Sequence, residues 1–226
     1  MKLYKHGKTK DVYSLDDGNY LLKFKDTVTG HPSGEKDPGG NSVVGEVEGV
    51  GKSAIMTTVY FFELLKKNNV PTHYVSNTLD KNEMTVRPAA VFGKGLEFVY
   101  RYVATGSFVK RFGDYCKDGD KIDVFEVTLK DDERNDPPVT KEILSALKLI
   151  TEEQYESIKS QTKQICDIIK ADLLKKGLEL IDIKLEFGNV GGKVMLIDEI
   201  SGGNMRVYKN GKKLDYNTLT ELIMKG

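Results

Sequence analysis

The segment from residue 181 to residue 188 alternates strictly between apolar and charged side chains, in the order Ile-Asp-Ile-Lys-Leu-Glu-Phe-Gly. A period of two predicts a β-strand whose four apolar residues lie on one face. The opposite face then carries Asp182, Lys184 and Glu186 together. A strand face that holds two acids and a lysine is the most informative local pattern in the chain.

A second acidic group is expected beside this face. Turn-forming residues occupy 189–192, and a return strand over 194–197 ends at Asp198 and Glu199. Two interpretations fit this pattern. The charges can form the solvated outer face of a hairpin. They can also form a Mg²⁺ site, because Mg²⁺ binds one or two protein carboxylates together with substrate phosphates.

Helical spacing of apolar residues predicts two longer helices, at 53–67 and at 152–176. Thr151 and Gln154 have the spacing of a capping box at the start of the second helix, and Gly177 ends it. Two shorter helices are expected at 140–147, capped by Thr140, and at about 217–224.

The remaining predicted secondary structure is mostly β-strand. Residues 12–15 and 20–24 flank a turn and predict an N-terminal hairpin. Residues 26–52 contain many turn formers and predict a long mobile loop, which would be either a functional lid or a disordered insertion. Further strands are expected at 72–76, 83–88, 96–103 and 122–129. These elements predict an α+β fold of two lobes, a small antiparallel lobe over 1–88 and a larger mixed lobe over 89–226.

Composition narrows the functional classes. The chain has 34 basic and 34 acidic residues, so its net charge of zero gives no electrostatic indication of nucleic-acid or membrane binding. No apolar run reaches the roughly 18 residues of a membrane span, and the start lacks a hydrophobic signal segment. Cys116 and Cys166 are too few for a disulfide framework, and Cys166 is expected to be a packed thiol on the second helix. We therefore expect a reduced, cytoplasmic protein.

Two N-terminal segments contain glycine beside lysine. The sequence Gly-Val-Gly-Lys-Ser at 49–53 resembles a P-loop, but Glu46 stands where that motif needs glycine, so we reject it. Lys8 and Lys10 follow Gly7 and can meet phosphates as point charges.

A further segment, 101–111, is a stronger candidate for phosphate binding. It places small residues and the hydroxyl of Ser107 between Arg101 and Arg111. Arg206 is another candidate, because it lies just beyond the acidic pair Asp198-Glu199.

With these segments in place, the chain resembles the SAICAR synthetase family, the phosphoribosylaminoimidazole-succinocarboxamide synthases of purine biosynthesis. The strand that carries Lys184 and the Gly-Ser-x-x-Lys-Arg segment are specific when found together. The matching segments keep the family's order over nearly the whole length, at residues 7–13, 24–26, 62–65, 70–73, 104–111, 182–188 and 198–201.

The resemblance implies a two-lobed enzyme with a kinase-like N-terminal lobe and the active site in the cleft. It implies an ATP-dependent ligase that joins the carboxylate of the imidazole ribotide CAIR to the amine of aspartate. ATP would first convert the carboxylate, a poor acyl donor, into an acyl phosphate. The implied partners are small-molecule substrates and a second copy of the chain in a homodimer, with no nucleic acid and no membrane.

The resemblance also assigns roles to individual residues. Glu186 and Asp198 would hold Mg²⁺ at the triphosphate. The residues implied to bind ATP are Lys8, Lys10, Glu186 and Asp198.

On the ribotide side, the resemblance implies that Arg101, Ser107 and Arg206 hold the substrate and that Asp182 and Lys184 orient it. Arg111 belongs to the matching 104–111 segment, and Lys130 and Asp136 are expected to line the same cleft. We take Lys184, Asp182 and Lys130 as the catalytic candidates, and Arg101, Ser107, Arg111, Arg206 and Asp136 as the substrate-binding ones.

The chain departs from the family's pattern on elements expected to face the substrate. Tyr102 replaces asparagine, Gly202-Gly203 replaces Pro-Asp, Asp131 replaces asparagine, and Thr57-Thr58 replaces Asn-Asn. Three hypotheses stay open on the sequence: a SAICAR synthetase that has drifted, a ligase of the same fold for another acid or amine, and a non-catalytic nucleotide-binding or regulatory protein.

Overall fold

Two antiparallel sheets organise the computed structural model, which describes residues 1–30, 33–34, 36–38, 40 and 42–225. The first sheet has five strands in the order β1-β2-β3-β7-β6. The expected N-terminal hairpin is confirmed as β2 and β3, and Gly18 adopts a φ of +86° in its turn. The strands are β1 (Lys2–His6), β2 (Lys10–Ser14), β3 (Tyr20–Phe24), β6 (Tyr74–Thr78) and β7 (Glu83–Val86).

The second sheet has seven strands. Its main path is β10-β9-β11-β13-β14, and β8 and β12 also pair with β11. The central strand β11 spans Glu179–Val190 and contains the alternating segment. The other strands are β8 (Ala90–Val91), β9 (Leu96–Val103), β10 (Lys121–Leu129), β12 (Lys193–Ile197), β13 (Met205–Lys209) and β14 (Lys212–Lys213).

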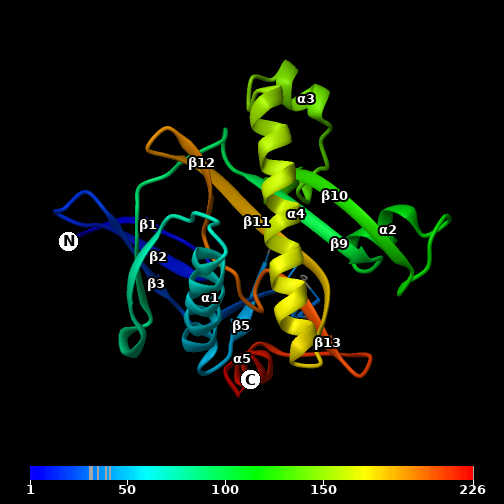
Figure 1. Ribbon diagram of the computed structural model, residues 1–226, viewed down its shortest axis with the longest axis horizontal. Coiled ribbons are helices and arrows are strands. Elements are labelled where there is room, and N and C mark those ends of the chain that lie inside the picture. Colours follow the sequence, from blue (N-terminus) through cyan, green and yellow to red (C-terminus); the bar gives the residue numbers. More distant parts are fainter. Residues whose placement is uncertain (31–32, 35, 39, 41, 226) are drawn as a thin grey trace.

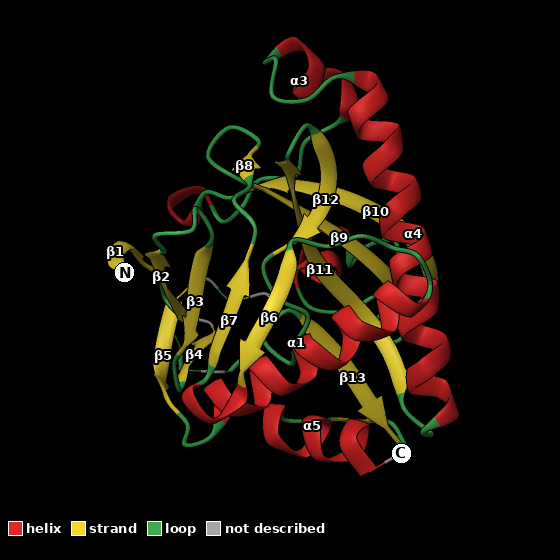
Figure 2. Ribbon diagram, turned by 60° about the vertical axis from the view of Figure 1, so that its left-hand side comes forward, coloured by secondary structure: helices red, strands yellow, loops and turns green. Residues whose placement is uncertain are grey.

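One long helix packs against the second sheet, and two further helices pack against each other. The long helix α4 (Glu152–Lys175) crosses β9, β10 and β11, whereas α1 (Val50–Lys67) and α5 (Tyr216–Lys225) lie side by side (Figures 1 and 2). The remaining described helices are short: α2 (Ser107–Phe112), α3 (Lys141–Ala146) and two 3₁₀ turns (Leu79–Lys81 and Asp132–Arg134). The α+β class and the expected helices are confirmed, and Thr151 and Gln154 form the predicted capping box.

One hydrophobic cluster contains residues of both sheets. Leu22 and Met84 of the first sheet belong to it, together with Phe98 and Leu185 of the second. Cys166 of α4 is fully buried in the same cluster, which confirms that it is a packed thiol. The sheets divide between residues 86 and 90, but the division into two lobes stays a proposal because the core is shared.

The apolar face of β11 differs from the expected pattern at the start of the alternating segment. Pairing with β13 shifts register between Leu180 and Asp182, so Ile181 is the extra residue of a bulge. Leu180 therefore joins Ile183 and Leu185 in the core cluster in the place expected for Ile181. The charged face from Asp182 onwards keeps its predicted alternation.

The expectation of a long loop over 26–52 is wrong for most of the described part. Strands β4 (Thr27–Gly30) and β5 (Ser42–Glu46) pair antiparallel and form a third, two-stranded sheet. Val28 is fully buried, which anchors this hairpin although its sequence is rich in turn formers. Residues 31–32, 35, 39 and 41 of the expected loop lie outside the described residues.

Helix α1 begins three residues before the expected Ser53. Gly49 has a φ of +80° and precedes the first turn, and the Asp26 carboxylate accepts a hydrogen bond from the Gly51 amide at 2.8 Å. Lys52 donates to the Leu79 carbonyl oxygen at 2.7 Å. The Gly51 amide and the Lys52 amine, which would bind phosphate in a P-loop, are thus hydrogen-bonded within the protein. This agrees with the rejection of a P-loop. None of the helices within the described residues is long and apolar enough to span a membrane.

Candidate active site

Two adjoining cavities lie along the charged face of β11. The first, of about 480 Å³, is lined by Lys10 of the first sheet, by Glu186 of the second, and by Asp198, which directly follows β12. The second, of about 390 Å³, is lined by residues that include Arg101, Ser107, Asp182 and Arg206. Glu97 and Lys184 line both cavities, so β11 carries its alternating charges from one into the other.

Strand register explains why these residues meet. Asp182 lies opposite Arg101 of β9 and opposite Arg206 of β13. Glu186 lies opposite Ile197 of β12, which brings Asp198 next to it. The expectation that the return strand delivers the acidic pair beside the charged face is confirmed.

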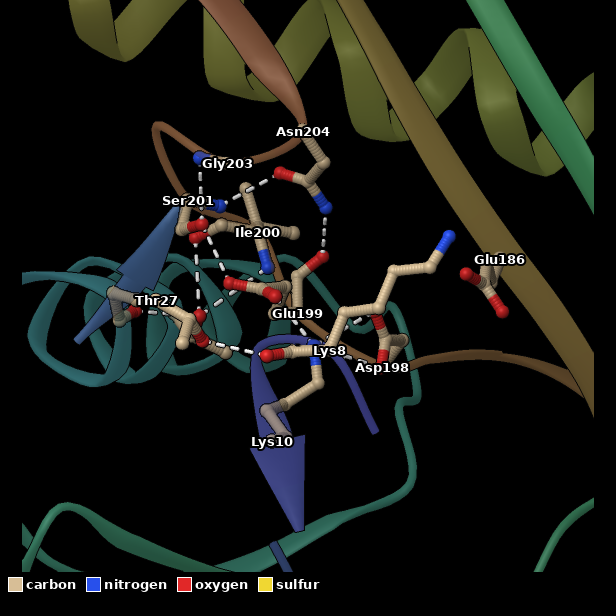
Figure 3. Close-up of polar contacts among 12 residues, drawn as sticks. Lys8, Lys10, Thr27, Glu186, Asp198, Glu199, Ile200, Ser201, Gly203 and Asn204 are labelled. Carbon is tan, nitrogen blue, oxygen red and sulfur yellow. Dashed lines mark hydrogen bonds and ion pairs between the residues drawn. The ribbon is translucent and has the colours of Figure 1, made fainter. Parts of the chain in front are cut away.

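Lys10 crosses from β2 to the acidic pair (Figure 3). Its amine lies 3.1 Å from the Asp198 carboxylate and also contacts Glu199. Burial alone would lower the pKa of Lys10, but the charges of both acids raise it above its ordinary value, so the lysine stays charged. Burial would raise the pKa of Asp198, but the charges of Lys10 and Lys130 lower it to about 2.

Glu186 has a different environment at the same cavity. It accepts a hydrogen bond from Lys130 at 2.5 Å. Burial, and after it the charge of Asp198, nevertheless raises the pKa of Glu186 above its usual value. Two carboxylates that repel each other in this way suit a hard divalent cation. No group of three or more such ligands occurs among the described residues, so the other ligands would be phosphate and water oxygens, as Mg²⁺ prefers.

A tight turn after Glu199 fixes the position of that acid, and sequence reasoning missed it. The Ser201 hydroxyl donates to Glu199 at 2.5 Å, and the Gly203 amide donates to the same hydroxyl oxygen at 2.9 Å (Figure 3). The Asn204 side chain accepts from the Ser201 amide at 2.8 Å. Gly202-Gly203, which departs from the family's pattern, therefore belongs to a compact turn that supports the acid.

A continuous chain of ion pairs runs beside the second cavity, and four of its members, Arg101, Arg111, Asp182 and Arg206, line that cavity. Arg101 lies 2.9 Å from Asp182 and 3.1 Å from Glu126, and Arg206 lies 2.5 Å from Asp182 and 2.7 Å from Asp37. The whole chain runs Arg111–Glu126–Arg101–Asp182–Arg206–Asp37–Lys213. Three of its members, Glu126, Asp37 and Lys213, were not among the sequence candidates.

The small residues before α2 bring the chain close to this array. Gly106 has a φ of +56°, and a Cβ there would lie 2.8 Å from the Arg206 guanidinium. Only glycine combines that backbone conformation with so close an approach. Ser107 follows, and its hydroxyl accepts a hydrogen bond from Arg101 at 3.1 Å.

Lys184 lies between the two cavities and is held by a buried acid. Its amine donates to Glu97 at 2.8 Å, and Thr128 donates to the other oxygen of Glu97 at 3.3 Å. Glu97 was missed by sequence reasoning, although a strand over 96–103 was expected. Its register against β11 was not.

The other sequence candidates lie at the edges of the cavities. Lys8 pairs with Asp132 at 2.5 Å, and both line the first cavity. Asp136 lines the second cavity and accepts from the Asp131 amide at 2.7 Å. Lys130 lines the first.

Tyr102 does not face the cavities, which corrects the interpretation of this departure as substrate-facing. Its hydroxyl donates to Asp167 of α4 at 3.1 Å, and the Lys170 amine lies 3.7 Å from its ring centroid. Thr57 and Thr58 are likewise buried in helix contacts, the first against Thr220 at 2.8 Å. These departures therefore affect packing against α4 and α5 rather than the lining of the second cavity.

Comparisons with known proteins agree with this geometry. The phosphoribosylaminoimidazole-succinocarboxamide synthase of Clostridium tetani is 52% identical over 227 residues, covering 99% of this chain and all of the relative. A SAICAR synthetase structure from structural genomics superimposes with a TM-score of 0.84 at 30% identity, covering 98% of each chain. A SAICAR synthetase in complex with ADP also gives 0.84, at 28% identity, covering all of this chain and 91% of the other. The SAICAR synthetase family model matches residues 3–219, and the chain belongs to that family.

Proposed function

We propose that the protein is an ATP-dependent carbon–nitrogen ligase that joins the carboxylate of CAIR to the amine of L-aspartate, as SAICAR synthetases do. The observation that carries the proposal is the pair of adjoining cavities along β11. One combines Lys10 with two carboxylates, and the other presents Arg101 and Arg206. A nucleotide and an anionic ribotide would therefore meet beside Lys184.

The first cavity suits the nucleotide. Lys10 and Lys8 would contact its phosphates, and one relative of known structure was solved with ADP. Glu186 and Asp198 would hold Mg²⁺, which when bound neutralises charge on the triphosphate. Lys130, paired with Glu186, would stabilise negative charge that develops on the transferred phosphoryl group.

The second cavity suits the ribotide. Arg101 and Arg206 would bind its phosphate with Ser107, because guanidinium groups match phosphate oxygens in bidentate pairs. Arg111 would reinforce this array through Glu126, which it shares with Arg101.

At the junction of the two cavities the reacting groups would meet. Lys184 and Asp182 would orient the imidazole carboxylate, and Asp136 would line its approach. A carboxylate oxygen attacks the γ-phosphorus of ATP, and the bond to ADP breaks. The aspartate amine then attacks the acyl carbon, loses a proton and expels phosphate. A homodimer, implied by the family resemblance, stays a prediction.

Measurement of ADP release tests this proposal. We expect ADP release over repeated turnovers only when ATP, CAIR, aspartate and Mg²⁺ are all present, together with a product of the mass of the amide. Lys184→Gln should abolish this release, whereas Lys193→Gln, which makes the same change at an exposed position at the start of β12, should not. Release of ADP with another amine but not with aspartate would favour a ligase of the same fold with different substrates. Nucleotide binding without any ADP release would refute catalysis.

A further inference from the structure

The ion-pair chain of the second cavity includes one acid that does not come from the second sheet. Asp37 lies between β4 and β5, yet its carboxylate accepts two hydrogen bonds from Arg206, at 3.0 and 2.7 Å. Lys213 donates to the same carboxylate at 3.2 Å. Burial disfavours the charged form of Asp37, but Arg206 and Lys213 outweigh it and hold the pKa of this carboxyl below its usual value.

Two described residues close to Asp37 also line the cavities. Pro38 and Gly40 line both of them. The Asp37 amide donates to the Thr29 carbonyl oxygen at 3.2 Å, and the Gly40 amide donates to the Asp37 carbonyl oxygen at 2.9 Å. Asp37 is thus joined to the β4–β5 hairpin by backbone hydrogen bonds and to the second sheet through its carboxylate.

The net charge of the ion-pair chain indicates the function of the contact between Asp37 and Arg206. The ion-pair chain contains four cationic groups and three carboxylates, a net charge of +1. If Asp37 leaves the chain, the net charge becomes +2, which is opposite and equal to that of a phosphomonoester dianion. Asp182 and Glu126 lie on paired strands of the sheet, so they cannot leave as readily.

We propose that Asp37 is the resident counter-ion of the phosphate subsite and that the phosphate of an incoming ribotide replaces it on Arg206. The inference rests on the proposed function, because it takes the second cavity as the ribotide site. Exchange of one carboxylate for a dianion favours phosphomonoesters over monoanions, which can only match the charge of Asp37. Asp37 is therefore a specificity-determining residue that lowers phosphate affinity and sharpens its selectivity.

Binding of ribose 5-phosphate to the full chain, measured by calorimetry, tests the exchange. If Asp37 occupies Arg206 in about 90% of molecules, the apparent dissociation constant is raised about tenfold. Asp37→Asn should then bind ribose 5-phosphate about tenfold more tightly, with unchanged affinity for ADP. Glu46→Gln removes the same charge from the exposed end of β5 and should leave both affinities unchanged. Unchanged or weaker binding by Asp37→Asn would overturn the proposal.

A second variant separates exchange from a general gain of positive charge. Glu126→Gln also removes one carboxylate from the ion-pair chain, but from β10, where Glu126 fixes Arg101 and Arg111. We expect this variant to bind ribose 5-phosphate more weakly than the native protein. Equal tightening by Glu126→Gln and Asp37→Asn would show that net charge alone acts, and would refute exchange.

Amide hydrogen exchange of the β4–β5 hairpin is a further test. If Asp37 had only a structural role, ribose 5-phosphate would not change the exchange rate of this hairpin. Ribose 5-phosphate should accelerate amide exchange in β4 and β5 of the native protein, because the ligand releases Asp37. Slower exchange on binding would mean that the hairpin closes with Asp37 in place, and would overturn the proposal. Because ribose 5-phosphate needs no catalysis, these results stand whether or not CAIR and aspartate are the substrates.

Discussion

Glu186 and Asp198 face the same cavity, yet their ionisation affects folding in opposite directions. Burial and the charge of Asp198 raise the pKa of Glu186. Lys10 and Lys130 outweigh burial and lower the pKa of Asp198 to about 2. An acid with a raised native pKa loses stability once the pH rises above its unfolded pKa, whereas an acid with a lowered native pKa gains stability there. The cavity thus contains one acid that opposes folding and one that favours it.

Isosteric amides should reveal this difference. At pH 7, Glu186→Gln is expected to raise the melting temperature of the ligand-free protein, because it removes an unfavourable charge and Lys130 is partly exposed to solvent. Asp198→Asn is expected to lower the free energy of unfolding by about 2 kcal/mol, the equivalent of its pKa shift. Asparagine tolerates the φ of +68° at this position, so backbone strain adds little. Both variants should lose Mg²⁺-dependent ADP release.

The pH dependence of the stability difference between the native protein and Asp198→Asn is the control for this prediction. The stabilisation from Asp198 should be complete above about pH 4 and disappear as the pH falls through about 2, because both states then bind the proton. Urea unfolding of native protein and Asp198→Asn should therefore differ at pH 7 and converge in acid. A difference that persists in acid, or Mg²⁺-dependent turnover that survives in both variants, would contradict the assignment.

Residues on regular strands could be placed from the sequence, and residues that depend on pairing could not. The alternation of β11 was sufficient to put Asp182, Lys184 and Glu186 on one face. Glu126 lies on β10, which lacks this alternation, and its position beside Arg101 depends on a register that no local pattern reveals. Asp37 lies in a segment without periodicity, so its ion pair with Arg206 could not be foreseen.

At the scale of elements, the cap of α4 contributes to stability without touching the cavities. The Thr151 hydroxyl accepts from the Gln154 amide at 3.2 Å, and the Gln154 side chain accepts from the Thr151 amide at 2.9 Å. Thr151→Ala should lower the free energy of unfolding by about 1 kcal/mol in chemical denaturation, with ADP release unchanged. Thr140→Ala is the matched control, because the Thr140 cap of α3 has a longer contact of 3.4 Å. An equal or larger loss in the control would contradict this ranking.

Helices were predictable because their signals are local. Apolar spacing and the capping residues of α4 lie within the helix itself. The β4–β5 hairpin was missed because its runs of strand-forming residues, Thr-Val-Thr and Val-Val, are short, and Gly45 and the turn formers between the strands outweigh them. Burial of Val28 and the contact of Asp37 with the second sheet decide its conformation, and both are tertiary.

At the scale of the molecule, the shared core bears on whether the two sheets fold independently. Helix α1 lies in the N-terminal part of the chain, yet its Thr57 contacts Thr220 of α5, and its Tyr60 donates to Asp172 of α4 at 2.9 Å. The His73 amide also donates to the Leu196 carbonyl oxygen at 3.1 Å. A cut near residue 88 would expose the apolar face of α1, so a functional cleft between two sheets does not require two folding units.

We therefore expect a single cooperative unfolding transition, with equal calorimetric and van't Hoff enthalpies. ADP with Mg²⁺ at about 100 times its dissociation constant should stabilise that transition by about 2.7 kcal/mol, because the first cavity is built from both sheets. A fragment of residues 1–88 should lack fixed tyrosine signals in near-ultraviolet circular dichroism, which is a clean probe because the chain contains no tryptophan. Two resolved transitions, of which ADP shifts only one, would instead mean that the lobes fold separately and that the cleft forms only when they dock.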